Sequence, residues 1–127
     1  MDAVRGRKKI LILDKDVEIG KLYAIILSEE FEVFQAVSAQ EMKQKFFDTV
    51  FDLFIIGHQF PPATSLDLIR SEPTLFSGKP IIMITGDDVR TIARKAYQLG
   101  VSALLQKPYG ISELLNKVRD CLRDREC

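Results

Sequence analysis

The sequence predicts an α/β domain with a doubly wound parallel β-sheet between two layers of helices, a three-layer sandwich. Five short apolar runs recur along the chain, and the segments between them carry apolar residues at helical spacing. Several of the runs are almost continuously apolar, which is typical of strands covered on both faces. Five alternating strand–helix units predict right-handed crossovers. We expect one domain over residues 1–127, with its core at about 8–123 and a basic lead-in at 1–7.

The expected strands are the apolar runs 9–13, 31–37, 52–56, 80–84 and 101–106. The runs KILIL, DLFII and PIIMI are the most continuously apolar, so we expect them inside the sheet. Glu32 and Gln35 interrupt the second run, which predicts an edge strand.

Apolar residues three and four positions apart predict the helices. Three such stripes occupy 19–27, 89–97 and 111–122. The letters SAQE at 38–41 form a capping box before a short helix, and Gly100 stands where a helix C-cap glycine belongs. A further short helix is expected around 66–70, between two prolines.

Composition excludes several classes of function. Eighteen basic and eighteen acidic side chains cancel, so no global field attracts nucleic acid or an anionic membrane. No apolar run approaches the roughly 20 residues of a membrane helix, and the N-terminal residues lack the apolar core of a secretory signal. Cytoplasm is therefore the expected compartment. Cys121 and Cys127 have no CxxC spacing and no histidine beside them, so no metal site is expected there.

The candidate site lies where the strands end, because ligands of open parallel sheets bind at the carboxyl ends of the strands. The segments at these ends are ILDKD, IIGHQFP, IMITG and LQKPY. The third strand delivers Gly57 to this edge, at a position where an acid or a nucleophile would be expected.

These four segments and their spacing resemble the receiver domain of bacterial two-component response regulators, a flavodoxin-like fold of the chemotaxis type, over about residues 8–123. The resemblance implies a sheet of order 2-1-3-4-5 and phosphoryl transfer to an aspartate at the end of the third strand. In the family, acids after the first strand bind Mg²⁺ together with that aspartate. A hydroxyl and a lysine contact the phosphoryl group.

Carried onto this sequence, the resemblance assigns the first acid to Asp14, the hydroxyl to Thr85 and the lysine to Lys107. Lys15 replaces the second acid, and Gly57 stands at the phosphoacceptor position. Two further positions complete the remnant site. Asp16 is expected to cap the first helix, and Leu104 replaces the aromatic residue that switches together with the hydroxyl.

These departures change the chemistry that the site can support. Glycine has no carboxylate to accept a phosphoryl group, and an added ammonium group disfavours a cation that needs oxygen ligands. We therefore expect Mg²⁺ binding to be lost or very weak, with no cofactor and no catalytic residue. Asp14 is the expected partner of Lys107, and the resemblance implies a cis bond between Lys107 and Pro108.

The sequence thus favours a degenerate receiver, or pseudo-receiver. It would be a non-enzymatic signalling module that acts by protein–protein interaction. Family receivers signal through the face formed by the fourth helix, the fifth strand and the fifth helix. A signalling protein, an output domain or a second copy would bind that face. The candidate interface residues are Arg90, Arg94, Lys95, Gln98, Gln106, Tyr109 and Lys117.

Two alternatives remain open. The first is a phosphorylatable regulator that uses a non-standard acid. Asp52 lies at the wrong end of the third strand, Asp87 and Asp88 are expected to cap a helix, and His58 is expected to point away from the site.

The second alternative is a flavodoxin-like protein that binds a nucleotide or flavin. The loop DKDVEIG is acidic where such proteins cradle phosphate, and no GxGxxG or GxxxxGK[ST] motif occurs. Direct DNA binding has no basic helix to support it. The sequence is also compatible with an excerpt of a longer regulator.

Overall fold

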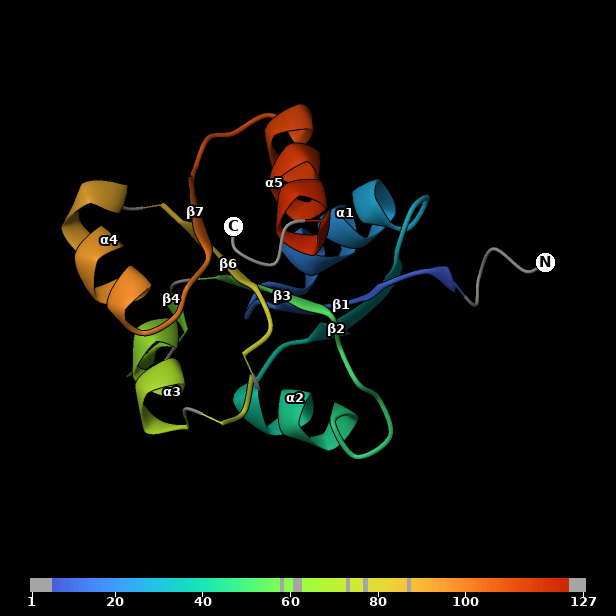
Figure 1. Cartoon of the computed structure of the whole chain (residues 1–127), viewed down its shortest axis with the longest axis horizontal. Helices are drawn as coiled ribbons and strands as arrows, with labels where there is room; N and C mark the ends of the chain where they lie inside the picture. The colour runs from blue at the N-terminus through green and yellow to red at the C-terminus, as the bar shows by residue number, and fades with distance from the viewer. Residues whose placement is uncertain are drawn as a thin grey trace.

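A computed structural model describes residues 6–57, 59–60, 63–72, 74–76, 78–86 and 88–123, and contains the predicted three-layer sandwich (Figure 1). The five main strands are β1 Lys9–Leu13, β2 Glu32–Ala36, β3 Leu53–Gly57, β6 Ile81–Thr85 and β7 Ala103–Gln106. The helices are α1 Val17–Leu27, α2 Ala39–Lys45, α3 Ser65–Ser71, α4 Val89–Gln98 and α5 Ile111–Arg123. Each element lies within a few residues of its predicted position.

The sheet is parallel throughout, with strand order β2-β1-β3-β6-β7. Counted over the main strands alone, this is the expected order 2-1-3-4-5, and β2 lies at an edge as predicted. One small feature was not predicted. The strands β4 Gln59–Phe60 and β5 Ala63–Thr64 form a two-stranded antiparallel sheet between β3 and α3.

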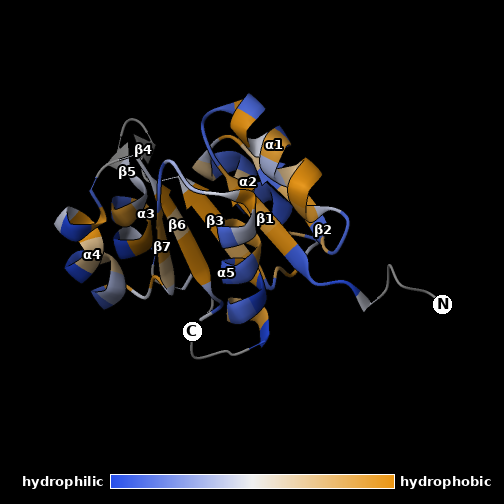
Figure 2. Cartoon of the chain, turned by 90° about the horizontal axis from the view of Figure 1, so that it is seen from above, coloured by the Kyte–Doolittle hydropathy of each residue, from blue (hydrophilic) through white to orange (hydrophobic). Residues whose placement is uncertain are grey.

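Alternate residues of the strands face two separate hydrophobic cores. One core joins the sheet to α1 and α5, and includes Ile12, Ile55 and Leu114. The other joins the opposite face to α2, α3 and α4, and includes Met42 and Ile69. Figure 2 shows the hydrophobic strands β1, β3 and β6 between these helical layers. Burial on both faces explains why these strands are almost continuously apolar.

The helix ends follow the expected signals with one correction. Gly100 follows Leu99, the C-cap of α4, and has a φ of 103°, a left-handed conformation that glycine adopts readily. At the start of α2 the Ser38 hydroxyl accepts a hydrogen bond from the Glu41 backbone N–H, at 3.0 Å. The Glu41 carboxylate accepts from the Val37 N–H instead of the Ser38 N–H. The predicted capping box is therefore only half formed.

A complete capping box occurs at the start of α3, where the sequence only suggested a short helix. Thr64 and Asp67 each accept from the backbone N–H of the other, and Asp67 also pairs with Arg70 one turn later. Within the described residues, no helix is long and apolar enough to cross a membrane.

Candidate functional site

The strand register brings the predicted site residues to one edge of the sheet. Leu13 pairs with Ile56, Gly57 pairs with Ile84, and Thr85 pairs with Gln106, so the three inner strands end at the same level. The chain positions after these ends are those of Asp14 and Lys107. The spacing of the four segments in the sequence therefore corresponds to one site in space.

Asp14 lies against Gly57. A Cβ atom built on Gly57 would stand 2.8 Å from Oδ2 and 3.3 Å from Cγ of the Asp14 carboxylate. Both distances are shorter than ordinary contacts, so the carboxylate occupies space that any larger residue at position 57 would need. The Asp14 carboxylate can therefore lie at this position because residue 57 has no side chain.

Backbone hydrogen bonds hold this carboxylate. Asp14 Oδ1 accepts from the Asp16 N–H at 2.9 Å, and the Asp14 N–H donates to the Ala36 carbonyl at 3.1 Å. Asp16 Oδ1 in turn accepts from the N–H groups of Glu18, at 2.9 Å, and Ile19, at 3.4 Å. The expected role of Asp16 as the N-cap of α1 is confirmed. Lys15, between the two acids, is exposed.

Ser65 is a member of the site that sequence reasoning did not identify. It is the first residue of α3, it is fully buried, and its hydroxyl donates to the Gly57 carbonyl through a short hydrogen bond. The contact fixes the start of α3 to the end of β3. The sequence carried one signal for it, because Ser65 directly precedes the short helix that was expected around 66–70.

Thr85 is buried, with 1% of its surface exposed, whereas Lys107 is exposed. The Lys107 N–H donates to the Thr85 carbonyl at 2.8 Å, and the bond between Lys107 and Pro108 is cis, as expected. The expected pairing of Lys107 with Asp14 was wrong. Within the described part of the chain these two residues form no ion pair, and Lys107 is exposed, so hydration competes with pairing.

Tyr109 lies in a groove between α1 and α5, away from the face predicted for it. The groove has a volume of about 280 Å³, and Tyr23 and Leu22 of α1 also line it. The ring centroids of Tyr23 and Tyr109 are 6.2 Å apart, and the two hydroxyl groups interact with each other. Burial raises the pKa of Tyr109, and the hydrogen bond to Tyr23 and the nearby Asp14 carboxylate raise it further.

Burial also raises the pKa of Tyr23, while the interaction with the Tyr109 hydroxyl lowers this pKa and the Asp14 charge raises it. Both hydroxyl groups therefore stay protonated at neutral pH. Sequence reasoning missed this tyrosine pair because α1 and α5 are far apart along the chain.

The remaining predicted interface residues lie on or beside α4, β7 and α5. Arg94, Lys95 and Gln98 are exposed along α4. Arg90 forms an ion pair with Asp88, whose carboxylate also accepts from the Arg90 N–H and so caps α4 as expected. These contacts lower the pKa of Asp88. The other two members of the candidate interface are the exposed Gln106, which accepts from the Val89 N–H, and the half-buried Lys117.

Leu104, at the position of the switch aromatic, is half-buried and packs against the core on the α2, α3 and α4 face. His58 and Asp87, which were considered as alternative acceptors or caps, lie outside the described residues. Asp52 accepts from the Lys9 N–H at 2.8 Å, at the opposite end of β3 as predicted. Across the described ranges, no three histidine, cysteine or acidic side chains gather closely enough to hold a metal ion.

Comparison with known proteins agrees with this architecture. Residues 10–119 match the family model described as the response regulator receiver domain. The regulatory protein VanR of Enterococcus faecium is 31% identical over 119 residues, which cover 91% of this chain and 50% of the relative. The transcriptional regulatory protein CrdR of Helicobacter pylori is 28% identical over 120 residues, which cover 93% of this chain and 56% of the relative. The chain thus spans about half the length of these relatives.

Among solved structures, a CheY-like response regulator receiver domain protein from Methanospirillum hungatei has a TM-score of 0.84 and 29% identity. The match covers 95% of this chain and 98% of that one. Three observations lead to the same assignment. They are the strand order of the sheet, the site at the carboxyl ends of the strands, and the family match over most of the chain. This chain belongs to the response regulator receiver domain family, the receiver modules of two-component signalling.

Proposed function

We propose that this chain is an atypical receiver that signals through protein–protein contacts and takes no phosphoryl group at position 57. The observation that carries the proposal is the contact between Asp14 and Gly57. Aspartyl phosphorylation needs a carboxylate in line with the phosphoryl donor. Gly57 supplies none, and the Asp14 carboxylate fills the space beside it.

The neighbouring carboxylates are poorly suited to replace that nucleophile. Asp14 Oδ1 is engaged by the Asp16 N–H, and Asp16 Oδ1 accepts two N–H groups at the start of α1. A carboxylate that accepts such hydrogen bonds is held in place and its charge is partly neutralised, which reduces its nucleophilicity. These contacts weigh against a non-standard phosphoacceptor at the end of β1.

The same residues are a poor fit for Mg²⁺. The ion prefers near-octahedral oxygen ligands, commonly carboxylates, carbonyls and water. Asp14 lies at the meeting point of β1 and β3, the neighbouring Asp16 carboxylate is engaged as the cap of α1, and Gly57 supplies no oxygen ligand from a side chain. Lys15, which replaces an acid, adds a positive charge in place of a ligand. We therefore propose that Mg²⁺ binds very weakly and that no other cofactor is required.

The proposed contact surface is formed by α4, β7 and α5, where Arg94, Lys95 and Gln98 are exposed. Tyr109 is omitted, because it packs against Tyr23 in the groove on the α1 side. The relatives are named as regulatory proteins, so a signalling protein or an output domain is the partner class that we propose. A second copy of the chain could occupy the same surface.

Intact-mass measurement after incubation with acetyl phosphate and Mg²⁺ tests the proposal. The expected result is an unchanged mass, under conditions in which a receiver with the usual aspartate gains one phosphoryl group. A gain that persists in Asp14→Asn and Asp16→Asn variants would point to another acceptor. Any stoichiometric gain would contradict signalling without phosphorylation and would favour a non-standard acceptor.

A further inference from the structure

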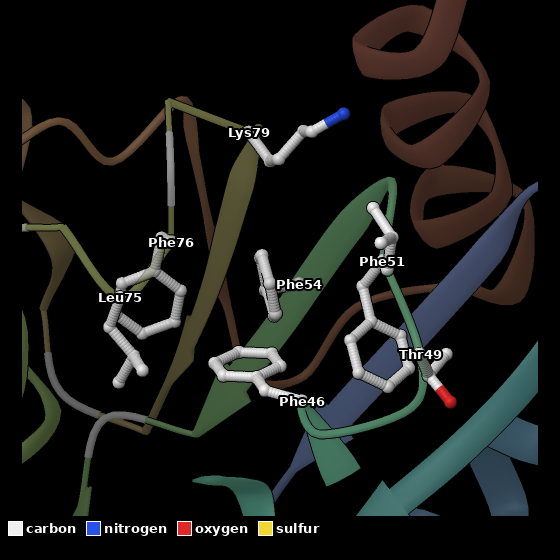
Figure 3. A pocket seen from close by; sticks show the side chains of 8 residues that line it. Phe46, Thr49, Phe51, Phe54, Leu75, Phe76 and Lys79 are labelled. Atoms are coloured by element: carbon white, nitrogen blue, oxygen red, sulfur yellow. The ribbon is translucent and has the colours of Figure 1, made fainter.

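A second pocket lies at the opposite end of the sheet from Gly57, and neither receiver chemistry nor the contact surface accounts for it. Its volume is about 230 Å³, and Figure 3 shows it from close by. The segment between α2 and β3 forms one side, and the segment between α3 and β6 forms the other. The pocket is lined by Phe46, Thr49, Val50, Phe51, Phe54, Leu75, Phe76 and Lys79.

Four phenylalanine rings build most of the wall. Phe54 stands at the centre, with ring centroids 4.9 Å from Phe76, 5.8 Å from Phe46 and 6.0 Å from Phe51. The contacts to Phe76 and Phe46 are edge-to-face, the arrangement that aromatic rings favour. Phe51, Phe54 and Phe76 are each only 2–3% exposed, so they form the deep part of the pocket.

The size of the pocket limits what fits. Protein interiors leave few voids larger than a water molecule, and an apolar cavity of about 150 Å³ in another protein stays dry and binds benzene. A pocket of about 230 Å³ is therefore large enough for one aromatic ring with a short chain. It is smaller than the roughly 300–1,000 Å³ of typical sites for drug-sized ligands.

One charged group lies at the rim. Among the described residues Lys79 has no ion-pair partner, whereas Lys43 on the neighbouring helix pairs with Glu72. Figure 3 shows Lys79 at the edge of the pocket, beyond Phe54, with its ammonium group directed away from the rings. An anion held on a short chain at the mouth of the pocket would meet this ammonium group, while the ring remained among the phenylalanines.

We propose that this pocket binds a small aromatic carboxylate, with its ring among Phe46, Phe54 and Phe76 and its carboxylate at Lys79. Val50, which lines the pocket, is 76% exposed, and Phe47, next to Phe46 in the chain, is 89% exposed. The binding site is independent of the residues at Gly57. It gives the chain a means to respond to a small molecule without phosphorylation.

NMR titration with 3-phenylpropanoate tests the inference, with 3-phenylpropan-1-ol and propanoate as partial ligands. We expect amide shifts at 46–54 and 75–79 with the aromatic acid, weaker shifts with the alcohol and none with propanoate. Leu75→Trp should fill the pocket and abolish binding. Leu22→Trp, in the groove between α1 and α5, is the matched control and should bind normally.

Lys79→Met keeps the apolar stem but removes the charge, so the aromatic acid should bind about three- to fivefold more weakly, as for a partly exposed ion pair. The alcohol should be unaffected. Lys45→Met, on α2 and not among the lining residues, is the charge control. Equal binding of acid and alcohol, or no effect of Lys79→Met, would overturn the assigned ligand class.

Three other results would overturn the site itself. The first is that millimolar 3-phenylpropanoate causes no amide shifts, and the second is that the shifts are confined to the groove between α1 and α5. The third is that the Leu75→Trp variant binds 3-phenylpropanoate unchanged. Sedimentation velocity adds an independent measurement. A dimer that dissociates in a Phe47→Ser variant would mean that a second copy covers the pocket, and the small-ligand proposal would then be wrong.

Discussion

The Asp14 carboxylate and Gly57 occupy one another's space at the end of the central strands. Oδ2 of Asp14 lies 2.8 Å from the point where a Cβ of residue 57 would stand, and Oδ1 is held by the Asp16 N–H. The contact joins the loop after β1 to the tip of β3. The position of the Asp14 carboxylate therefore depends on a glycine at position 57.

Gly57→Ala tests this contact directly. The new methyl group should push the Asp14 carboxylate away and weaken its hydrogen bond to Asp16, so the free energy of unfolding should fall by about 1 kcal/mol. Urea unfolding measures the change. Gly86→Ala is the matched control, because a Cβ there would meet nothing within 4 Å, and it should stay within about 0.5 kcal/mol of the parent. Equal effects of the two substitutions would contradict the proposed crowding.

Gly57→Asp should create a pair of crowded carboxylates. Because like charges at close range disfavour the folded state, we expect a loss of about 1–2 kcal/mol in the absence of metal. Adding Lys15→Asp should let Mg²⁺ restore stability, with a gain of about 1.4 kcal/mol for each tenfold increase of Mg²⁺ above its dissociation constant. The parent chain should show no such gain in urea unfolding. Equal Mg²⁺ stabilisation of the parent would argue against the proposed loss of the metal site.

Ser65→Ala should remove the hydroxyl that donates to the Gly57 carbonyl. Since Ser65 is fully buried, the loss should cost about 1–2 kcal/mol of unfolding free energy. Ser71→Ala, at the exposed end of the same helix, is the control and should cost less than about 0.5 kcal/mol. Thermal or urea unfolding distinguishes them. A neutral Ser65→Ala would show that α3 is fixed to β3 by other contacts.

Lys107→Met should change stability by less than about 0.5 kcal/mol, because the lysine is exposed and forms no ion pair with Asp14 within the described residues. Urea unfolding at low and at moderate salt measures the effect. A salt-dependent loss of stability would mean that the ammonium group pairs with Asp14 in solution after all.

The tyrosine pair predicts an alkaline limit of stability. The folded pKa of Tyr109 is raised above its ordinary value of 10.0, so the folded state retains a proton that the unfolded chain releases. The resulting stabilisation is complete below pH 10 and is lost as the pH rises towards the folded pKa. Unfolding free energies between pH 8 and 11 should therefore decline from about pH 10.

Tyr109→Phe removes one of the two hydroxyl groups of the pair, and the decline should become shallower. Tyr97→Phe is the control, because Tyr97 is 52% exposed on α4. If Tyr97→Phe flattened the decline as much as Tyr109→Phe, the alkaline loss would not arise from the pair of Tyr23 and Tyr109.

Much of the fold could be predicted because its signals are local. Burial on both faces makes the inner strands continuously apolar, and helical spacing marks the helices between them. The edge position of β2 followed from Glu32 and Gln35. The two-residue strands β4 and β5 were missed because segments that short carry no periodic pattern.

The site was only partly predictable. Its members could be identified because parallel strands deliver their ends to one edge, and Asp16 could be recognised as a cap from its place before α1. Lys107 was assigned the wrong partner, and Tyr109 was assigned to the wrong face. Both errors concern contacts between side chains that are far apart in the sequence. The spacing of residues along the chain does not specify where such side chains point.

The sequence by itself determined the order of strands and helices, the residues at the carboxyl edge of the sheet, and the lack of a carboxylate at position 57. Backbone geometry and burial impose a periodic pattern of apolar residues on each helix and strand, and this pattern can be read from neighbouring positions in the sequence. Only the tertiary structure decided that Asp14 fills the space above Gly57, that Ser65 ties α3 to β3, and that four phenylalanines enclose a pocket at the far end. Such contacts depend on packing between segments that meet only after the chain has folded.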